Sequence, residues 1–447
     1  MSIGLLQSVF CRHWFCQQVI EIWNDEATLK QWISVELALA KAQSKVGLIP
    51  AAAYQIIVDK ARPECIDLQR MQKDIAHAMH PFVPLLHQLE ELCGDEAAGY
   101  LHWGATTQNI FDTAQALQLK DSHRLLIDYM AKGLQALAKL ATQHRNTPQA
   151  GRTHGQHALP ITFGYKVAGW LAEIHRHYQR LKDASQNDFV VSMGGAVGTF
   201  SAMGGKGREV QALLAIDLGL TPALIPVRVA FDHCSHYATL LGGLAATIEK
   251  IAHEVVFMQR NEINELEESF HLGKIGSSTM AQKRNPQMAM NLLGLARLAR
   301  SRIPLLQENM VRMNEGDSSA CNVADQVLPE LVIITVSLAK SFSELINGLH
   351  IKTDKMQSNL AITQGQIVSE AVMMALAHHI GRHQAHKVLY DIAQNATATG
   401  KSYASLLASH PLIQPVLHQI DLPALLQPSN YLGEAGECVD AVLQNAT

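Results

Sequence analysis

Apolar residues recur every three or four positions through long stretches of this chain, which is the spacing of one face of an α-helix. Over 236–270 the steps alternate between three and four residues, close to the period of about 3.5 residues in a supercoiled seam. A helix over that span would be roughly 50 Å long, and helices of that length bury their apolar stripe in a bundle. The stripe consists of Leu241, Leu244, Ile248, Ile251, Val255 and Met258.

Three further stripes with this spacing lie between 114 and 350. We expect the last of them to belong to a helix that begins at Pro329 and ends at Gly348. No sustained two-residue alternation appears in the chain, so the pattern does not indicate a sheet, and it predicts an all-α fold. The stripes are Leu126, Met130, Leu134, Leu137 and Ala141; Leu171, Ile174, Tyr178 and Leu181; and Leu331, Ile334, Leu338, Phe342 and Leu345.

The lengths of the predicted helices divide the chain into three helical domains. Residues 1–110 contain short helices. For one of them 23–26 offers a capped start, and Gly47 and Pro50 are expected to stop it. Residues 111–350 form a central long-helix bundle, and shorter helices broken by prolines occupy 351–447.

Composition narrows the class of protein. Hydrophobic residues make up 48% and charged residues 17% of the chain, as in a soluble globular protein. A net charge of -4 provides no basic surface, so we expect no nucleic-acid partner. The seven cysteines include no C-x-x-C pair, which argues against a disulfide framework or zinc ribbon and favours a reducing cytoplasm. We find no leader and no run of about 18 apolar residues, so we expect a cytoplasmic protein with no membrane partner.

Neither a metal nor a cofactor is indicated. Some of the 22 histidines are spaced like ligand pairs, but no H-E-x-x-H motif or cysteine partner accompanies them. The glycine-rich stretch 194–199 matches neither nucleotide-binding glycine motif, so a nucleotide site is not predicted there.

The first candidate binding loop comes directly before a predicted helix. Thr106, Thr107 and Gln108 follow Gly104, and hydroxyl and amide groups at a helix start can hold a carboxylate. The alternative is an ordinary helix cap provided by Thr107 or Asn109.

The second candidate loop, 151–164, lies between the first two long helices and contains His154. A histidine in a polar, glycine-flanked loop is a reasonable proton donor, because its pKa lies near working pH. The alternative for a lone histidine is a structural role.

The third candidate loop, 276–286, interrupts long helical sequence and is rich in hydrogen-bond donors, as a loop that handles an anion must be. A serine hydroxyl becomes usable as a base only if backbone N–H groups and a nearby cation stabilise its alkoxide. Ser277, Ser278 and Lys283 supply the hydroxyls and the cation, and Gly276 would let the loop close over a substrate. The alternative is a helix–helix connector with capping serines.

These three loops resemble the three shared regions of the fumarase/aspartase superfamily. The third matches G-S-S-x-M-P-x-K-x-N-P except at Ala281, and the second matches G-x-T-H-x-Q-x-A-x-P-x-T-x-G throughout. The first resembles G-x-T-S-x-D, with Thr107 and Asn109 as replacements. The resemblance implies the superfamily's all-α fold of three domains, and a homotetramer whose active sites join regions from three subunits.

The same resemblance implies roles for the residues of these loops. Ser277 would be the base, Lys283 its cation and His154 the general acid. The substrate would be held by Asn285 and by Thr106, Thr107, Gln108, Thr153, Gln156 and Ser278.

Two branches of the superfamily resemble this chain, the 3-carboxy-cis,cis-muconate cycloisomerases over 363–386 and the adenylosuccinate lyases over the loop end that both share. Met290 and Ala230 stand where adenylosuccinate lyases have glutamate and glutamine, and Asp325 lies near where they have a phosphate-binding arginine. An aspartate there would repel phosphate. We therefore expect a small polycarboxylate substrate, with an adenylosuccinate lyase-like C–N lyase that releases fumarate as the alternative. A non-catalytic helical scaffold remains a lesser hypothesis.

Overall fold

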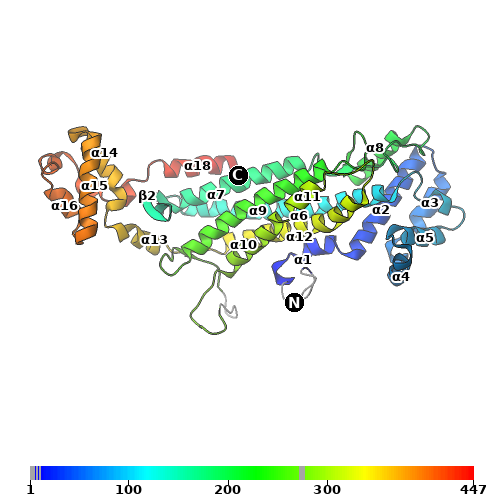
Figure 1. Cartoon of the computed structure of the whole chain (residues 1–447), viewed down its shortest axis with the longest axis horizontal. Helices are drawn as coiled ribbons and strands as arrows, with labels where there is room; N and C mark the ends of the chain where they lie inside the picture. The colour runs from blue at the N-terminus through cyan, green and yellow to red at the C-terminus, as the bar shows by residue number, and fades with distance from the viewer. Residues whose placement is uncertain (1–5, 7–8, 10–11, 271–276, 447) are drawn as a thin grey trace. The chain divides into compact units, whose positions relative to one another are not determined.

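The computed structural model describes residues 6, 9, 12–270 and 277–446 (Figure 1). These residues form 18 α-helices and three two-stranded sheets. The predicted all-α fold is confirmed, since the strands are short and few.

The chain forms two compact units, each assembled from separate stretches of sequence. The first contains Met1–Met130, His177–Glu249 and Asn291–Ser341, and the second contains Ala131–Arg176, Lys250–Met290 and Phe342–Thr447. The predicted domain boundaries near 110 and 350 stay a prediction.

Short helices dominate the start of the first unit. The expected cap is confirmed, because the Asn24 side chain accepts a hydrogen bond of 2.8 Å from the Ala27 amide at the start of α2. α2 ends at Lys45, before Pro50. Apart from the helices that carry the predicted stripes and α10 (Gln287–Arg300), this unit contains α1 (Gln17–Ile22), α2 (Asp25–Lys45), α3 (Ala51–Lys60), α4 (Leu68–Ala78), α5 (Phe82–Cys93), α8 (Gly207–Leu218) and α11 (Ile303–Glu308).

Five further helices carry the predicted apolar stripes or follow the third candidate loop (Figure 1). Every stripe residue is buried except Tyr178, which is partly exposed. The helices are α6 (Thr107–Gln143), α7 (Phe163–Ala184), α9 (Asp232–Met258), α10 (Gln287–Arg300) and α12 (Ser318–Asn347).

Two predicted helix limits are wrong. α9 ends at Met258 rather than near 270, because a turn follows in which the Glu265 amide donates to the Met258 carbonyl over 2.9 Å. α12 begins at Ser318, and Pro329 lies inside it. The start is set by Asp317, whose carboxylate accepts a hydrogen bond of 3.0 Å from the Ser319 amide.

α12 also corrects the expectation that no apolar run is long enough to span a bilayer. By length and composition it passes that test, with a mean hydropathy of 1.4 in its most apolar window. The helix pair 353–363 and 366–380 passes only as a span bent by 80°. In α12, 67% of the window is buried within the protein, as in the core helix of a globular domain.

The strands form three small pairs. β1 (Pro148–Thr153) and β2 (Gln156–Thr162) make an antiparallel hairpin that the sequence pattern did not predict. The other pairs are the parallel β3 (Val190–Val191) and β4 (Thr221–Pro222), and the antiparallel β5 (Leu266–Glu267) and β6 (His350–Ile351).

The C-terminal helices pack around a small apolar core in the second unit. Tyr403 is fully buried there beside Val372 and Leu376. The helices are α13 (Thr353–Leu360), α14 (Ser369–Ile380), α15 (Arg382–Thr399), α16 (Tyr403–Ser409), α17 (Leu422–Leu425) and α18 (Ala435–Ala446). Short 3-10 helices cover Arg12–Trp14, Pro63–Cys65, Ala98–Tyr100, Ala361–Thr363, Gln366–Val368, Gln414–Gln419 and Pro428–Asn430.

Candidate active site

The first candidate loop leads into α6, in the first unit. Thr106 precedes the helix, and its amide donates to the Asn109 side chain over 3.1 Å, while the Asn109 amide donates to the Thr106 carbonyl over 2.9 Å. This reciprocal arrangement resembles a capping box. Asn109 therefore provides the cap, and the partly exposed side chains of Thr106, Thr107 and Gln108 are left to face a ligand.

Asn109 also joins this loop to the glycine-rich turn. Its side chain is fully buried, donates to the Ser192 carbonyl over 2.7 Å and accepts from the Gly195 amide over 3.0 Å. Gly195 has a φ of 81°, which favours glycine. The turn thus supports the loop, and an aspartate at 109 would lack the donor for Ser192.

Helix α2 holds the same loop from another side. The Glu36 carboxylate, only 1% exposed, contacts His102 Nδ1 at 2.6 Å and accepts from the His102 amide over 3.2 Å. Gln43 donates to the Trp103 carbonyl over 2.6 Å. Sequence reasoning assigned no role to Glu36 or Gln43.

One turn into α6, Gln108 donates a hydrogen bond of 2.6 Å to the Asp112 carboxylate. Burial raises the pKa of Asp112 to about 6, and the nearby Asp325 adds to this effect. Gln108 is therefore both a predicted substrate contact and the partner of an acid that titrates near neutral pH.

The second candidate loop is the β1–β2 hairpin of the second unit, with His154 and Gly155 at its tip. Both have positive φ, 52° and 78°, as a two-residue type I′ turn requires. Thr153 and Gln156 pair directly below the turn. Because all four residues are exposed, His154 is not a buried structural histidine, and its imidazole is available to a substrate.

A bulge at the base of the hairpin sets the direction of the next side chain. The β1–β2 register shifts between Ala150 and Arg152, around Gly151. A Cβ on Gly151 would lie 2.7 Å from the Leu159 carbonyl oxygen, so this position requires glycine. The bulge explains the glycine that opens the second family motif.

The third candidate loop places two amides on the proposed base. Ser277 Oγ accepts hydrogen bonds from the amides of Thr279, over 3.3 Å, and Met280, over 3.1 Å. Ser277 is partly exposed and Ser278 is exposed. Gly276, the predicted hinge, lies outside the described residues.

Lys283 and Asn285 line an open pocket of about 900 Å³ within the second unit. Four cations and two glutamates border it. Arg284 and Lys352 each pair with Glu267 at 3.0 Å. Lys283 is exposed and has no carboxylate within 4.0 Å in the described parts of the chain, so it can meet an anion. The charged lining residues are Arg260, Lys283, Arg284, Lys352, Glu262 and Glu267.

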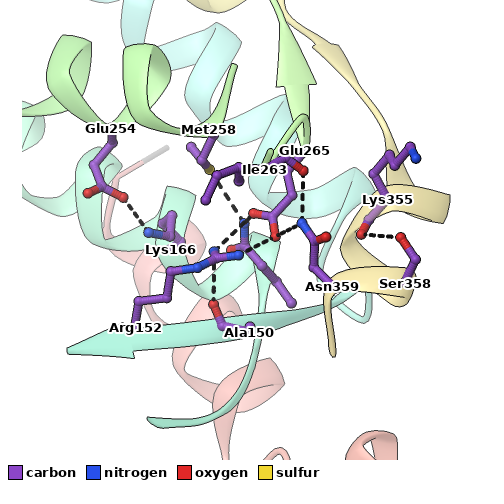
Figure 2. A network of polar contacts seen from close by, with 11 residues as sticks. Ala150, Arg152, Lys166, Glu254, Met258, Ile263, Glu265, Lys355, Ser358 and Asn359 are labelled. Carbon is purple, nitrogen blue, oxygen red and sulfur yellow. Dashed lines mark hydrogen bonds and ion pairs between the residues drawn. The ribbon is translucent and has the colours of Figure 1, made fainter. Parts of the chain in front are cut away.

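A buried carboxylate lies behind the hairpin, at the start of the segment that leads to the third loop. The Glu265 side chain is 0% exposed. Its Oε1 accepts a hydrogen bond of 2.6 Å from Arg152 Nη2, and its Oε2 accepts one of 3.1 Å from Arg152 Nη1 (Figure 2). Gln149 and Asn359 donate to the same carboxylate over 2.7 and 2.8 Å. Burial and the neighbouring Arg152 lower the pKa of His157, which favours the neutral form of that imidazole.

The next glutamates of this segment hold the far end of the third loop. The Glu268 carboxylate accepts from the amides of Met288, over 3.1 Å, and Ala289, over 2.8 Å, at the N-terminus of α10. Glu267 pairs with Arg284 within the loop. Sequence reasoning missed all three glutamates, because nothing in their spacing separates them from a charged surface.

The structure divides the predicted site residues between its units. Thr106, Thr107 and Gln108 belong to the first unit, and the other site residues belong to the second. Within the described residues, no hydrogen bond joins Ser277, His154 and Lys283 to one another.

Comparison with known proteins places the chain in a family. Residues 16–300 match the family model described as lyase, and residues 365–442 match the one described as adenylosuccinate lyase C-terminus. The chain is 35% identical to an N-acetyl-S-(2-succino)cysteine lyase of Enterococcus italicus, over 94% of this chain and 92% of that protein. It is 36% identical to an adenylosuccinate lyase of Methanothermobacter thermautotrophicus, over 95% of both chains.

A solved structure agrees with these matches. The 3-carboxy-cis,cis-muconate lactonizing enzyme of Pseudomonas putida superposes with a TM-score of 0.91 at 31% identity and covers 98% of both chains. With the three loop motifs and the all-α fold, these similarities show that the chain is a lyase-family enzyme of the fumarase/aspartase superfamily, in the branch of the muconate cycloisomerases and adenylosuccinate lyases.

Proposed function

We propose that this enzyme acts on a small polycarboxylate, in the manner of a 3-carboxy-cis,cis-muconate cycloisomerase, with Ser277 as its base. The observation that carries the proposal is the pair of amides on Ser277 Oγ. Two N–H donors stabilise an alkoxide more than a neutral hydroxyl, and so favour the deprotonated serine that the chemistry needs.

The reaction is an elimination or its reverse. Ser277 takes a proton from the carbon beside a carboxylate, the bond from the neighbouring carbon to oxygen or nitrogen breaks, and an alkene forms. His154 gives a proton to the departing group where that group needs one. In the cycloisomerase direction, a substrate carboxylate oxygen attacks the alkene carbon and the Ser277 hydroxyl donates its proton to the adjacent carbon. The alkoxide that remains is stabilised by the two amides and regains a proton from water before the next turnover.

The pocket beside the loop suits a substrate with several carboxylates. Lys283 has no carboxylate partner of its own there, and Asn285 adds an amide-bearing side chain to the lining. Charge-assisted hydrogen bonds from such groups to carboxylates are about twice as strong as neutral ones. Thr153, Gln156, Ser278 and the Thr106–Gln108 loop would hold the remaining carboxylates.

The relatives favour a second candidate, a lyase that removes fumarate from a succino conjugate. Two of them are named for succino compounds, one with cysteine and one with a nucleotide. Asp325 lies close enough to Asp112 to raise the pKa of that carboxyl, while Arg312 and Arg228 lie near it and lower that pKa, so the charges around these two aspartates are mixed. A compact leaving group is favoured over a nucleotide by Asp325 alone, which lies near the position of the phosphate-binding arginine in adenylosuccinate lyases.

We further propose a cytoplasmic homotetramer whose active sites combine loops of different subunits. The predicted site residues belong to two units of the chain, and the three helical domains of 1–110, 111–350 and 351–447 would each contribute to the assembly. The chemistry proposed here needs neither a metal nor an organic cofactor.

The test is a comparison of kcat/KM for 3-carboxy-cis,cis-muconate, N-acetyl-S-(2-succino)cysteine and adenylosuccinate at one enzyme concentration. We expect the small tricarboxylate to be preferred and adenylosuccinate to be poor, because the loss of one charge-assisted phosphate contact costs about 1.5–3 kcal/mol. A value for adenylosuccinate above about 10⁴ M⁻¹s⁻¹, the low end of ordinary enzymes, would overturn the preference. If the succinocysteine compound is turned over fastest, the second candidate replaces the first.

A further inference from the structure

We propose that Glu265 is a positioning residue for His154, acting through Arg152 and the hairpin that carries both. The inference rests on the proposed function only in assigning His154 to catalysis. It concerns a carboxylate that does not line the candidate pocket and that the mechanism does not otherwise use.

The Glu265 carboxylate holds several segments together through hydrogen bonds. We call Glu265 and its partners Arg152, Gln149 and Asn359 the Glu265 clamp. The two carboxylate oxygens of Glu265 accept four hydrogen bonds of 2.6–3.1 Å from three side chains. Figure 2 shows those from Arg152 and Asn359, and the third side chain is Gln149. Arg152 and Gln149 come from strand β1, and Asn359 comes from α13. Its own carbonyl accepts from the Lys352 amide over 2.9 Å. One buried group therefore joins three segments that lie far apart in the sequence.

The ion pair is almost completely shielded from water. The side chains of Arg152 and Glu265 are 9% and 0% exposed. A charge buried to this extent is costly unless its partner is held in good geometry, and the two-pronged contact supplies that geometry. The Arg152 guanidinium also lies over the Phe257 ring, 5.7 Å from its centroid, which limits sideways movement.

The hairpin connects the Arg152–Glu265 ion pair rigidly to His154 at its tip. Arg152 lies in β1, two residues before His154 in the turn, and its register partner on β2 is His157. The turn between the strands has only two residues, so it adds little freedom between the clamp and the imidazole. The bulge at Gly151 leaves the register of β1 locally irregular, and a slip of one residue would turn the side chains of the strand to the opposite face. The Arg152–Glu265 contact opposes that slip.

The chain offers a matched control on the same segment. Glu267 is also a glutamate in an ion pair, but its partners are Arg284 and Lys352 rather than the hairpin. We therefore compare Glu265→Gln, which keeps the shape and removes the charge, with Glu267→Gln.

The first measurement is amide hydrogen exchange of the full-length enzyme, followed over 148–162. We expect exchange in β1 and β2 to accelerate at least about tenfold in Glu265→Gln and to stay within about twofold in Glu267→Gln. Equal protection in the two variants would overturn the proposal. This measurement needs no substrate, so it tests the clamp independently of the proposed function. The proposed function is tested separately, by turnover of 3-carboxy-cis,cis-muconate.

The second measurement is steady-state turnover of 3-carboxy-cis,cis-muconate. We expect Glu265→Gln to lower kcat by roughly 10–100-fold and to leave KM within about threefold, because a misplaced acid affects the chemical step more than binding. When Glu265→Gln is added to His154→Ala, we expect no further loss, since both changes remove one function. A fully additive loss would show that Glu265 acts elsewhere.

A third variant separates positioning from folding. Glu265→Gln combined with Arg152→Met leaves no unpaired buried charge, so we expect it to regain most of the thermal stability lost by Glu265→Gln alone. We expect kcat to remain low, because the clamp is still absent. Recovery of kcat together with stability would mean that the pair only holds the fold together, and would contradict the proposal.

Discussion

The amide of Met280 lies 3.1 Å from Ser277 Oγ and donates a hydrogen bond to it, and the Thr279 amide does the same over 3.3 Å. Two amides on one hydroxyl are also the arrangement of a capping serine. The same two donors would stabilise an alkoxide at Oγ, which the proposed role of Ser277 requires.

We expect Ser277→Ala to lower turnover by roughly 10²–10⁴, the usual cost of removing a general base. The fold and substrate binding should change little, because Ser277 is partly exposed and makes only local contacts. Rapid-mixing turnover and equilibrium binding of substrate would measure the two effects. Thr279→Ala, an exposed change that keeps the amide donor to Ser277 Oγ, is the matched control. Turnover of Ser277→Ala within about threefold of wild type would place the base elsewhere.

The Glu36–His102 contact predicts an effect on substrate binding from a residue that does not touch substrate. Removing a buried charged acceptor costs about 1.5–3 kcal/mol. We expect Glu36→Gln to lower stability by that amount and to raise KM severalfold, because the loop before Thr106 loses its support. Thermal unfolding and steady-state kinetics check both. Glu26→Gln, an exposed change on the same helix, should leave both unchanged, and an unaltered KM in Glu36→Gln would show that the loop is held without it.

Much of the fold could be predicted, because the buried face of a helix follows from the spacing of apolar residues along the sequence. The stripe from Leu241 to Met258 is buried as the pattern indicates. The ends of helices were harder to predict. Pro329 was expected to begin α12, but the cap at Asp317 lies earlier in the chain and the helix continues through the proline.

The exposed side chains of the candidate site could also be predicted from the sequence, since they fall in motifs with recognisable chemistry. The buried residues that hold these loops in place could not be predicted. Glu265 meets Arg152 across 113 positions of sequence, and Glu36 meets His102 across 66. No local periodicity encodes such pairs, so a buried glutamate resembles a surface glutamate until the fold is known. The β1–β2 hairpin was missed for a related reason, because its bulge at Gly151 interrupts the alternation of strand residues.

The pKa of Asp112 predicts a pH dependence of stability. This carboxyl has a pKa of about 6 in the folded protein and about 3.9 in an unfolded chain. The folded state therefore binds more protons than the unfolded state between those values, and stability falls as the pH rises through that window. Asp112→Asn removes the titrating carboxyl and with it this pH-dependent loss of stability.

Denaturant titrations of wild type and Asp112→Asn at pH 4.5 and 7.5 would measure the effect. We expect the variant to gain about 2 kcal/mol relative to wild type between the two pH values. Asp128→Asn, an exposed change on the same helix, is the control and should show a much smaller gain. An equal response of both variants would mean that Asp112 is ionised normally in the folded protein.

The proposed assembly predicts that two inactive variants restore each other. Several large apolar side chains of the first unit are more than half exposed, including Ile216 at 78%, Leu224 at 86% and Val311 at 80%, and such residues commonly mark surfaces that another chain covers. Sedimentation should show a homotetramer.

If His154 and Ser277 of one active site come from different subunits, the variants His154→Ala and Ser277→Ala, dissociated and reassembled together, should regain activity. In a random equal mixture, half of the subunits carry an intact His154 and half an intact Ser277, so about a quarter of the sites would contain both. Each variant reassembled alone is the control and should stay inactive. A mixture no more active than these controls, or a fully active monomer at nanomolar concentration, would show that each subunit builds its site alone.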